Sequence, residues 1–122
     1  MTLQRHNPPQ LSSAQTYSQL VVAQGAKTVY VSGQVALDAA GTLVGPGDLA
    51  MQAKQTFRNL VAALAAAGAT PASVAKMTWY IVNYDEDALP KLIEARREAF
   101  GSHAPSQHVD RCSNPRPEGI LD

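Results

Sequence analysis

Apolar residues in the middle of the chain recur at steps of three and four positions, the spacing that places side chains on one face of an α-helix. The positions that follow this spacing are Leu49, Ala53, Phe57, Leu60, Val61 and Leu64. The polar residues that lie between these positions fall mostly on the other faces of the predicted helix; they are Gln52, Lys54, Gln55, Arg58 and Asn59. Asp48 suits an N-cap and Gly68 suits the left-handed turn that ends many helices. The pattern predicts one long amphipathic helix over about residues 48–67.

A second helix is predicted from "ALPKLIEARREAF", residues 88–100, where apolar residues again follow helical spacing. Asp85 or Asp87 can cap it, and Pro90 falls in the first turn, where a missing N–H does no harm. Between the helices, "VAKMTWYIVNY" is rich in β-branched and aromatic residues. This composition favours a strand of about eight residues.

The N-terminal part predicts a hairpin. Residues 20–23 and 28–32 are two β-rich runs, and Gly25 between them can supply the positive φ that a tight turn often needs. Residues 1–16 are polar and contain "PP", so they predict an irregular arm. Residues 106–122 show no apolar period and predict an atypical tail that is not a strand.

The predicted order is hairpin, helix, strand and helix, which is typical of an α+β domain with two helices on one face of a mixed sheet. Three or four short strands are too few to cover two amphipathic helices. Either a further strand completes the sheet, or other subunits cover its open face or edge.

Composition and charge argue against some classes of function. The 122 residues predict a single domain, residues 1–122, and 45% of them are hydrophobic. Ten basic residues balance ten acidic ones, so charge gives no support to a nucleic-acid partner. No apolar run is long enough to span a membrane, and the start resembles no secretion signal, so a cytoplasmic protein is expected.

The strongest local signal for chemistry is Ser32-Gly33-Gln34, where a predicted strand breaks. A glycine at a strand bend lets a ligand or another backbone approach closely, and neighbouring N–H groups can face an anion. The alternative is a structural β-bulge, which the spacing alone favours.

Several motifs together resemble the Rid family, also called YjgF or L-PSP. They are the "SGQ" turn, the segment in which an aspartate is followed by a glycine-containing loop, the "Q…NL…L…AG" helix and the "V.K.T.Y" strand. The likeness runs from about Tyr17 to about Pro105. The resemblance implies a chorismate-mutase-like α+β fold with a six-stranded sheet, and a homotrimer with a pocket between subunits. It also implies hydrolysis of reactive enamines or imines, such as 2-aminoacrylate, to a keto acid and ammonia without a cofactor.

Site residues follow from the resemblance in part. Tyr17 matches the family's pocket tyrosine, and Ser32 and Gly33 match the turn whose backbone contacts the ligand, so these three are the implied catalytic residues. The family's carboxylate-binding arginine is replaced by Gln107 or Ser106. A neutral side chain cannot form that ion pair, whose loss costs on the order of 2 to 5 kcal/mol. Tyr17, Gly33 and Gln107 are therefore the implied substrate-binding residues.

The family's last strand carries a glutamate that handles protons, and the only tail glutamate here, Glu118, lies in "RPEG". The missing arginine and glutamate argue against full deaminase activity. The alternative is a non-catalytic trimer that binds small metabolites or other proteins, and a ribonuclease is less well supported.

A hypothesis for the tail is that residues from about Ser106 onward are a frame-shifted or vector-altered version of the family's C-terminal end. The segment "PSQHVDRCSNPRPEGIL" can be encoded by a DNA sequence that, read in a frame shifted by one nucleotide, translates to "PASTLIGVRTLARREFS". The shifted translation is similar to the family in that segment. The coding DNA tests this directly.

Two other clusters have simpler interpretations than a functional site. His103, His108, Asp110 and Cys112 lack the spacing of a zinc site, so a solvated tail and no metal are expected. Arg96 and Arg97 are expected on a solvated helix face.

Overall fold

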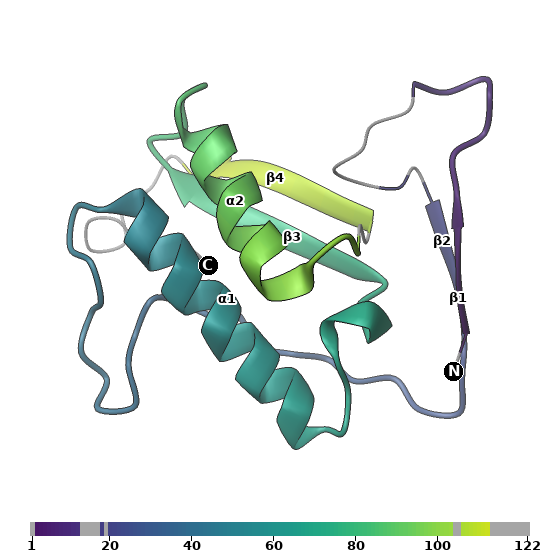
Figure 1. Ribbon diagram of the computed structural model, residues 1–122, viewed down its shortest axis with the longest axis horizontal. Helices are drawn as coiled ribbons and strands as arrows, with labels where there is room; N and C mark the ends of the chain where they lie inside the picture. Colours follow the sequence, from purple (N-terminus) through teal and green to yellow (C-terminus); the bar gives the residue numbers. More distant parts are fainter. Residues whose placement is uncertain (1, 13–17, 19, 104–105, 113–122) are drawn as a thin grey trace.

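The computed structural model describes residues 2–12, 18, 20–103 and 106–112. The described elements are β1 (Thr2–His6), β2 (Leu20–Gln24), α1 (Leu49–Ala66), a short 3-10 turn (Pro71–Ser73), β3 (Lys76–Val82), α2 (Ala88–Phe100) and β4 (Ser106–Cys112). They form an α+β fold in which both helices lie on the same face of the β3–β4 pair (Figure 1). This arrangement confirms the predicted fold class at the level of helices and sheet.

Both predicted helices are present. Asp48 caps α1 by accepting a hydrogen bond from the Met51 amide at 3.1 Å. At the other end Gly68 has a φ of 71°, and the amides after the helix donate back to its last carbonyls. A residue other than glycine would be strained in that conformation. For α2, Asp85 is the residue whose side chain caps the helix, by accepting from the Ala88 amide at 2.9 Å, whereas Asp87 makes no such bond.

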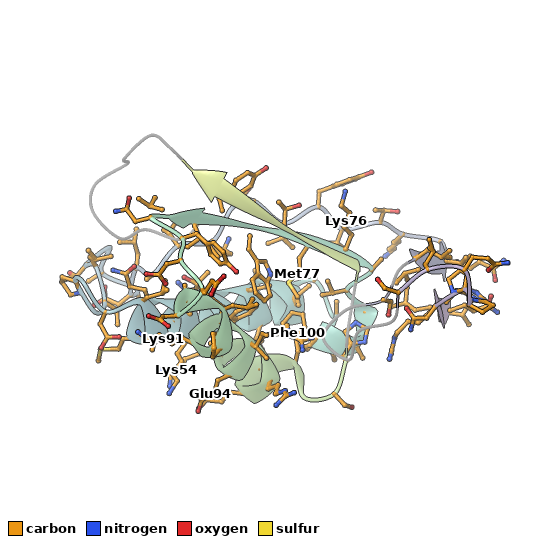
Figure 2. All side chains as sticks on the ribbon, turned by 90° about the horizontal axis from the view of Figure 1, so that it is seen from above. Lys54, Lys76, Met77, Lys91, Glu94 and Phe100 are labelled. Atoms are coloured by element: carbon orange, nitrogen blue, oxygen red, sulfur yellow. The ribbon has the colours of Figure 1, made fainter. Side chains whose placement is uncertain are left out.

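The helices and β3 enclose one apolar core. Its buried members are Ala53, Phe57, Trp79, Ile81, Ala88, Leu92, Ala95 and Phe100. Phe57 stands edge-on to both Trp79 and Phe100, with ring centroids 5.7 and 5.8 Å apart. In Figure 2, Met77 lies between the strands and the helices, while the charged side chains of Lys54, Lys91 and Glu94 lie on the outer side of the helices. The core therefore lies between the apolar faces of the two helices and the buried side of β3.

The predicted hairpin is wrong. β2 pairs antiparallel with β1, which lies in the segment predicted to be an irregular arm, and residues 28–32 form no strand. The side chains of β1 are almost all exposed, so this pairing depends on main-chain hydrogen bonds and leaves no apolar period in the sequence. Residues 28–32 have the composition of a strand but have no strand beside them among the described residues, and composition alone does not make a strand.

The prediction that the tail contains no strand is also wrong for residues 106–112. They form β4, which runs parallel to β3 with Lys76 opposite Ser106 and Val82 opposite Cys112. Parallel pairing again uses the main chain, which any non-proline residue can supply. In the described part of the chain the strands form two separate two-stranded sheets, whereas the resemblance implied a single sheet of six. One edge of β3 is therefore left without a described partner.

Candidate functional site

The segment that follows Ser32 ends in a turn that begins at Asp38 and runs to Thr42. One carboxylate oxygen of Asp38 accepts hydrogen bonds from the amides of Ala40 and Thr42, both at 2.9 Å. Its own amide donates to the Thr42 carbonyl, and Gly41 adopts a φ of 79°. Aspartate favours such turns because its short carboxylate reaches amides two to four residues on. The Asp38 turn thus fixes one end of the segment that carries Gly33.

The other side of this segment rests on α1. The Asn59 side-chain amide donates to the carbonyls of Val35 and Leu37, both at 2.8 Å. The Asn59 carbonyl oxygen in turn accepts from the Gln55 amide at 2.9 Å, one helical turn earlier. A single helix residue therefore ties down two backbone carbonyls that lie more than 20 positions away in the sequence.

An open hollow of about 390 Å³ lies between this segment and α1, and we call it the Gly33 hollow. Its lining residues are Gly33, Gln34, Val35, Leu37, Asp38, Ala39, Asn59 and Ala62. The hollow is open rather than enclosed, so the described residues alone would leave much of a bound ligand exposed. It is the place in the described structure where a predicted site residue meets a concave surface.

Gly33 itself faces open space. A Cβ built on Gly33 meets no heavy atom of the described residues within 4 Å, and its φ lies outside the left-handed range. The described chain therefore gives no steric or conformational reason for glycine at this position. A close approach by a ligand or a neighbouring chain and a structural β-bulge both stay predictions for this position.

Donors for a ligand are present in the backbone. The amides of Gly33 and Gln34 make no hydrogen bond to any described residue. The Gln34 side chain donates to the Ser32 carbonyl at 3.1 Å, which keeps that side chain on its own strand segment. Among the described lining residues Asp38 carries the only charge, and no lysine or arginine lies there. A ligand in the hollow would therefore meet neutral backbone donors and one carboxylate.

The other predicted site residues are placed in part. Ser32 is exposed and directly precedes Gly33. Tyr17 falls outside the described residues, and Gln107 is described only through its backbone in β4, where it pairs with Met77. Whether these two residues reach the Gly33 hollow stays a prediction.

The expectations for Arg96 and His103 are wrong. Arg96 is only 3% exposed, and its guanidinium donates to the His103 carbonyl at 3.0 Å. His103 is 7% exposed and its Nε2 donates to the Val74 carbonyl at 2.8 Å. Burial, followed by repulsion from Arg97, lowers the pKa of Arg96. The pair joins the end of α2 to the start of β3 and belongs to the scaffold.

Comparisons with known proteins agree with this architecture. The sequence profile of the family described as Endoribonuclease L-PSP matches residues 8–114 of the chain. The chain belongs to this family, the Rid family. The match includes Ser32, Gly33, Asp38 and Asn59, so the residues around the Gly33 hollow lie within the part shared with relatives.

Solved Rid structures show the same fold. YyfB from Yersinia pestis, a Rid-family protein of unknown function, superposes with a TM-score of 0.86 at 28% identity, covering 99% of this chain and 95% of that one. RidA from the Antarctic bacterium Psychrobacter gives a TM-score of 0.65 at 25% identity, covering 90% of this chain and 85% of RidA. The likeness therefore extends over nearly the whole chain.

Two relatives carry an activity in their names. A 2-iminobutanoate/2-iminopropanoate deaminase from the mite Dermatophagoides farinae is 32% identical over 75% of this chain and 68% of its own length. The rat protein of the same name is 37% identical over 57% of this chain and 50% of its own length. This chain thus spans about half to two thirds of these relatives.

Sequence reasoning predicted Gly33 as a site residue, whereas Asp38 and Asn59 lay within the motifs of the family resemblance but were not predicted as site residues. Asp38 had a local signal, since an aspartate followed within three residues by glycine is typical of a turn. The sequence signal for Asn59 is weaker. Asparagine is a poor helix former, so its presence inside a long helix indicates that its side chain makes a specific hydrogen bond.

No helix in the described part of the chain is long and apolar enough to cross a membrane.

Proposed function

We propose that this Rid-family protein hydrolyses small reactive imines or enamines to a ketone or keto acid and ammonia, without a cofactor, at the Gly33 hollow. The observation that carries the proposal is the open space at Gly33, beside two backbone amides that make no hydrogen bond to a described residue. The names of the deaminase relatives supply the substrate class.

The reaction needs few catalytic groups from the protein. Water adds to the imine carbon while the imine nitrogen takes up a proton, and the tetrahedral adduct then expels ammonia as its hydroxyl becomes a carbonyl. Backbone N–H groups at Gly33 and Gln34 can hold a substrate oxygen and orient the imine carbon toward water. Tyr17 and Ser32 are proposed to complete the polar contacts. The enzyme's contribution is then mainly orientation, which fits a site with few charged groups.

The site is proposed to be completed by a neighbouring subunit of a homotrimer. The hollow is open rather than enclosed, and the segment before it exposes apolar side chains, with Val29 50% and Tyr30 91% exposed. Exposed apolar residues on an unpaired segment favour association with another chain. Light scattering tests this proposal, and a monomer at micromolar concentration would contradict it.

A second candidate is a non-catalytic binder of small metabolites. It is favoured by the absence of lysine and arginine from the described lining of the hollow, since the keto acids formed by the relatives carry a carboxylate. The same feature, with the balanced net charge, leaves RNA hydrolysis without electrostatic support.

Freshly generated 2-aminoacrylate separates the two candidates. An enzyme accelerates pyruvate formation over buffer, and Tyr17→Phe is expected to lower kcat/KM at least tenfold. The matched change Tyr80→Phe, at an exposed position on β3 that does not line the Gly33 hollow, should leave it within twofold. No acceleration by the wild-type protein, together with measurable binding of pyruvate by calorimetry, would replace the enzyme proposal with the binder.

A further inference from the structure

The amide of Asn59 is fully engaged within the protein. Its nitrogen lies 2.8 Å from the carbonyl oxygens of both Val35 and Leu37. Since a carbonyl oxygen only accepts, both N–H groups of the amide must point to these two atoms. The Gln55 amide donates to the remaining oxygen, which fixes which way the Asn59 amide faces. Asn59 has no N–H left for a ligand.

The two carbonyls that Asn59 holds belong to a tight turn. The Leu37 amide donates to the Val35 carbonyl at 2.8 Å, so this carbonyl accepts two hydrogen bonds. On the same turn the Ala36 carbonyl accepts from the Val44 amide at 2.8 Å. The turn is therefore held by the helix through Asn59 and by the following loop through Val44.

Gly33 and Gln34 precede this turn directly and have no other anchor in the described structure except the Gln34–Ser32 contact. The direction in which their amides point is set by where Val35 is held. A shift of the turn would move the amides relative to the hollow, of which Asn59 itself forms part of the wall. Orientation of this kind is lost with displacements of about 1 Å.

We propose that Asn59, oriented by Gln55, is a positioning residue that sets the backbone amides of Gly33 and Gln34 for the substrate. The inference rests on the proposed function of the Gly33 hollow and adds to it a residue that acts through the loop rather than on the substrate.

Gln52 provides a matched comparison on the same helix. Its amide donates to the Gly45 carbonyl at 3.0 Å, so it too ties α1 to a loop carbonyl. Gly45 and Gln52 do not line the hollow. If Asn59 serves only to fasten a loop, the two residues are equivalent; if it positions the site, only Asn59 affects it.

The experiment compares Asn59→Asp with Gln52→Glu. Each change replaces a donating amide with a carboxylate of nearly the same shape, which cannot donate when ionised and repels the carbonyl it faces. Gln55→Leu is the milder third variant, because it leaves both Asn59 donors in place and removes only the bond that orients them. It keeps the test decisive if Asn59→Asp does not fold.

Three quantities are measured on each folded variant: the free energy of unfolding, the amide hydrogen exchange of Leu37 and Val44, and kcat/KM with 2-aminoacrylate. We expect Asn59→Asp to speed exchange at both amides and to lower kcat/KM at least tenfold. Gln55→Leu is expected to lower kcat/KM about threefold to tenfold, and Gln52→Glu to stay within twofold even where it costs equal stability.

Equal losses of kcat/KM in Asn59→Asp and Gln52→Glu at matched stability would overturn the inference, as would unchanged exchange at Leu37 and Val44 in Asn59→Asp. If Asn59→Asp does not fold, wild-type kcat/KM in Gln55→Leu overturns it. An inactive wild-type protein would contradict the proposed function instead, and the exchange data would then decide alone whether Asn59 holds the turn.

Discussion

Phe57 meets Trp79 edge-on with their ring planes 80° apart, and this contact joins the middle of α1 to the middle of β3. Both residues are 7% exposed and belong to the buried cluster between helices and sheet. Edge-to-face pairs add to the free energy that the buried aromatic area already contributes.

Phe57→Ala removes two aromatic contacts at once and leaves a cavity between α1, α2 and β3. The free energy of unfolding should fall by about 3 to 5 kcal/mol. Leu89→Ala, at a position 37% exposed on α2, is the control and should cost under about 1 kcal/mol. Chemical denaturation measures both, and similar losses in the two variants would place the core elsewhere.

Gly33→Ala separates function from folding. Because its φ is not left-handed and no described atom crowds the position, alanine should leave stability unchanged or raise it by up to about 1 kcal/mol. Activity or ligand binding should fall at least tenfold, since a methyl group then occupies the space proposed for the substrate. Thermal unfolding and the 2-aminoacrylate assay are run on the same samples.

Gly68→Ala is the matched control for that change. Gly68 has a φ of 71°, which alanine tolerates poorly, so this variant should lose about 1 kcal/mol of stability and keep its activity. A Gly33→Ala protein that loses both stability and activity in proportion would contradict the assignment of the hollow.

Asp85 and Asp87 make a clean test of which residue caps α2. Asp85 accepts a hydrogen bond from the Ala88 amide and Asp87 makes no side-chain cap bond. Asp85→Ala should therefore cost about 1 kcal/mol. Asp87→Ala should cost at most a few tenths of a kcal/mol, from the loss of a negative charge near the helix N-terminus. Urea denaturation resolves the difference, and the reverse order of costs would disprove the assignment.

Arg96→Met leaves the His103 carbonyl without its donor in a buried place, which should cost about 1 to 3 kcal/mol. Relief of the buried charge offsets part of that cost. The control Arg97→Met, on the exposed side of α2, should change stability by less than about 0.5 kcal/mol. Guanidinium chloride unfolding of the two variants gives the comparison.

The pH dependence of that difference has a defined sign. Burial, followed by repulsion from Arg97, lowers the pKa of Arg96 below the usual range of an arginine, so the folded state disfavours the charged form relative to the unfolded chain. That penalty is fully present at pH values below the lowered pKa and is relieved only as the pH rises through it toward the ordinary pKa of arginine. The stability difference between wild type and Arg96→Met should therefore be constant from about pH 6 to pH 9, and a slope in that range would mean that another group titrates with Arg96.

The helices were predictable because their evidence is local. Periodic apolar residues, Asp48 and Gly68 all act within a few positions of the turns that they stabilise. The strands β2 and β3 were also predicted from local composition. The strands β1 and β4 and the way the strands pair were not, because the β1–β2 and β3–β4 pairs join segments far apart through main-chain bonds that leave little trace in side-chain pattern. The hairpin failed for the converse reason, since residues 28–32 have strand composition but no partner strand within the described part of the chain.

The candidate site was likewise predictable only where the evidence is local. Gly33 was found because a glycine inside a strand pattern is itself informative. Asn59 was missed because its partners, Val35 and Leu37, lie 24 and 22 positions away and offer only backbone carbonyls, which every residue has. Tyr17 and Gln107, taken from the family resemblance, remain predictions.

The empty space at Gly33 bears on how variants of this protein should be selected. A library of variants sorted only for expression or thermal resistance would be free to replace Gly33, because no described part of the fold depends on it, while it would keep Gly68. Selection for ligand turnover would retain both glycines. Comparing the two selected pools position by position would therefore separate residues that the fold requires from residues that the ligand requires, whatever the chemical identity of that ligand.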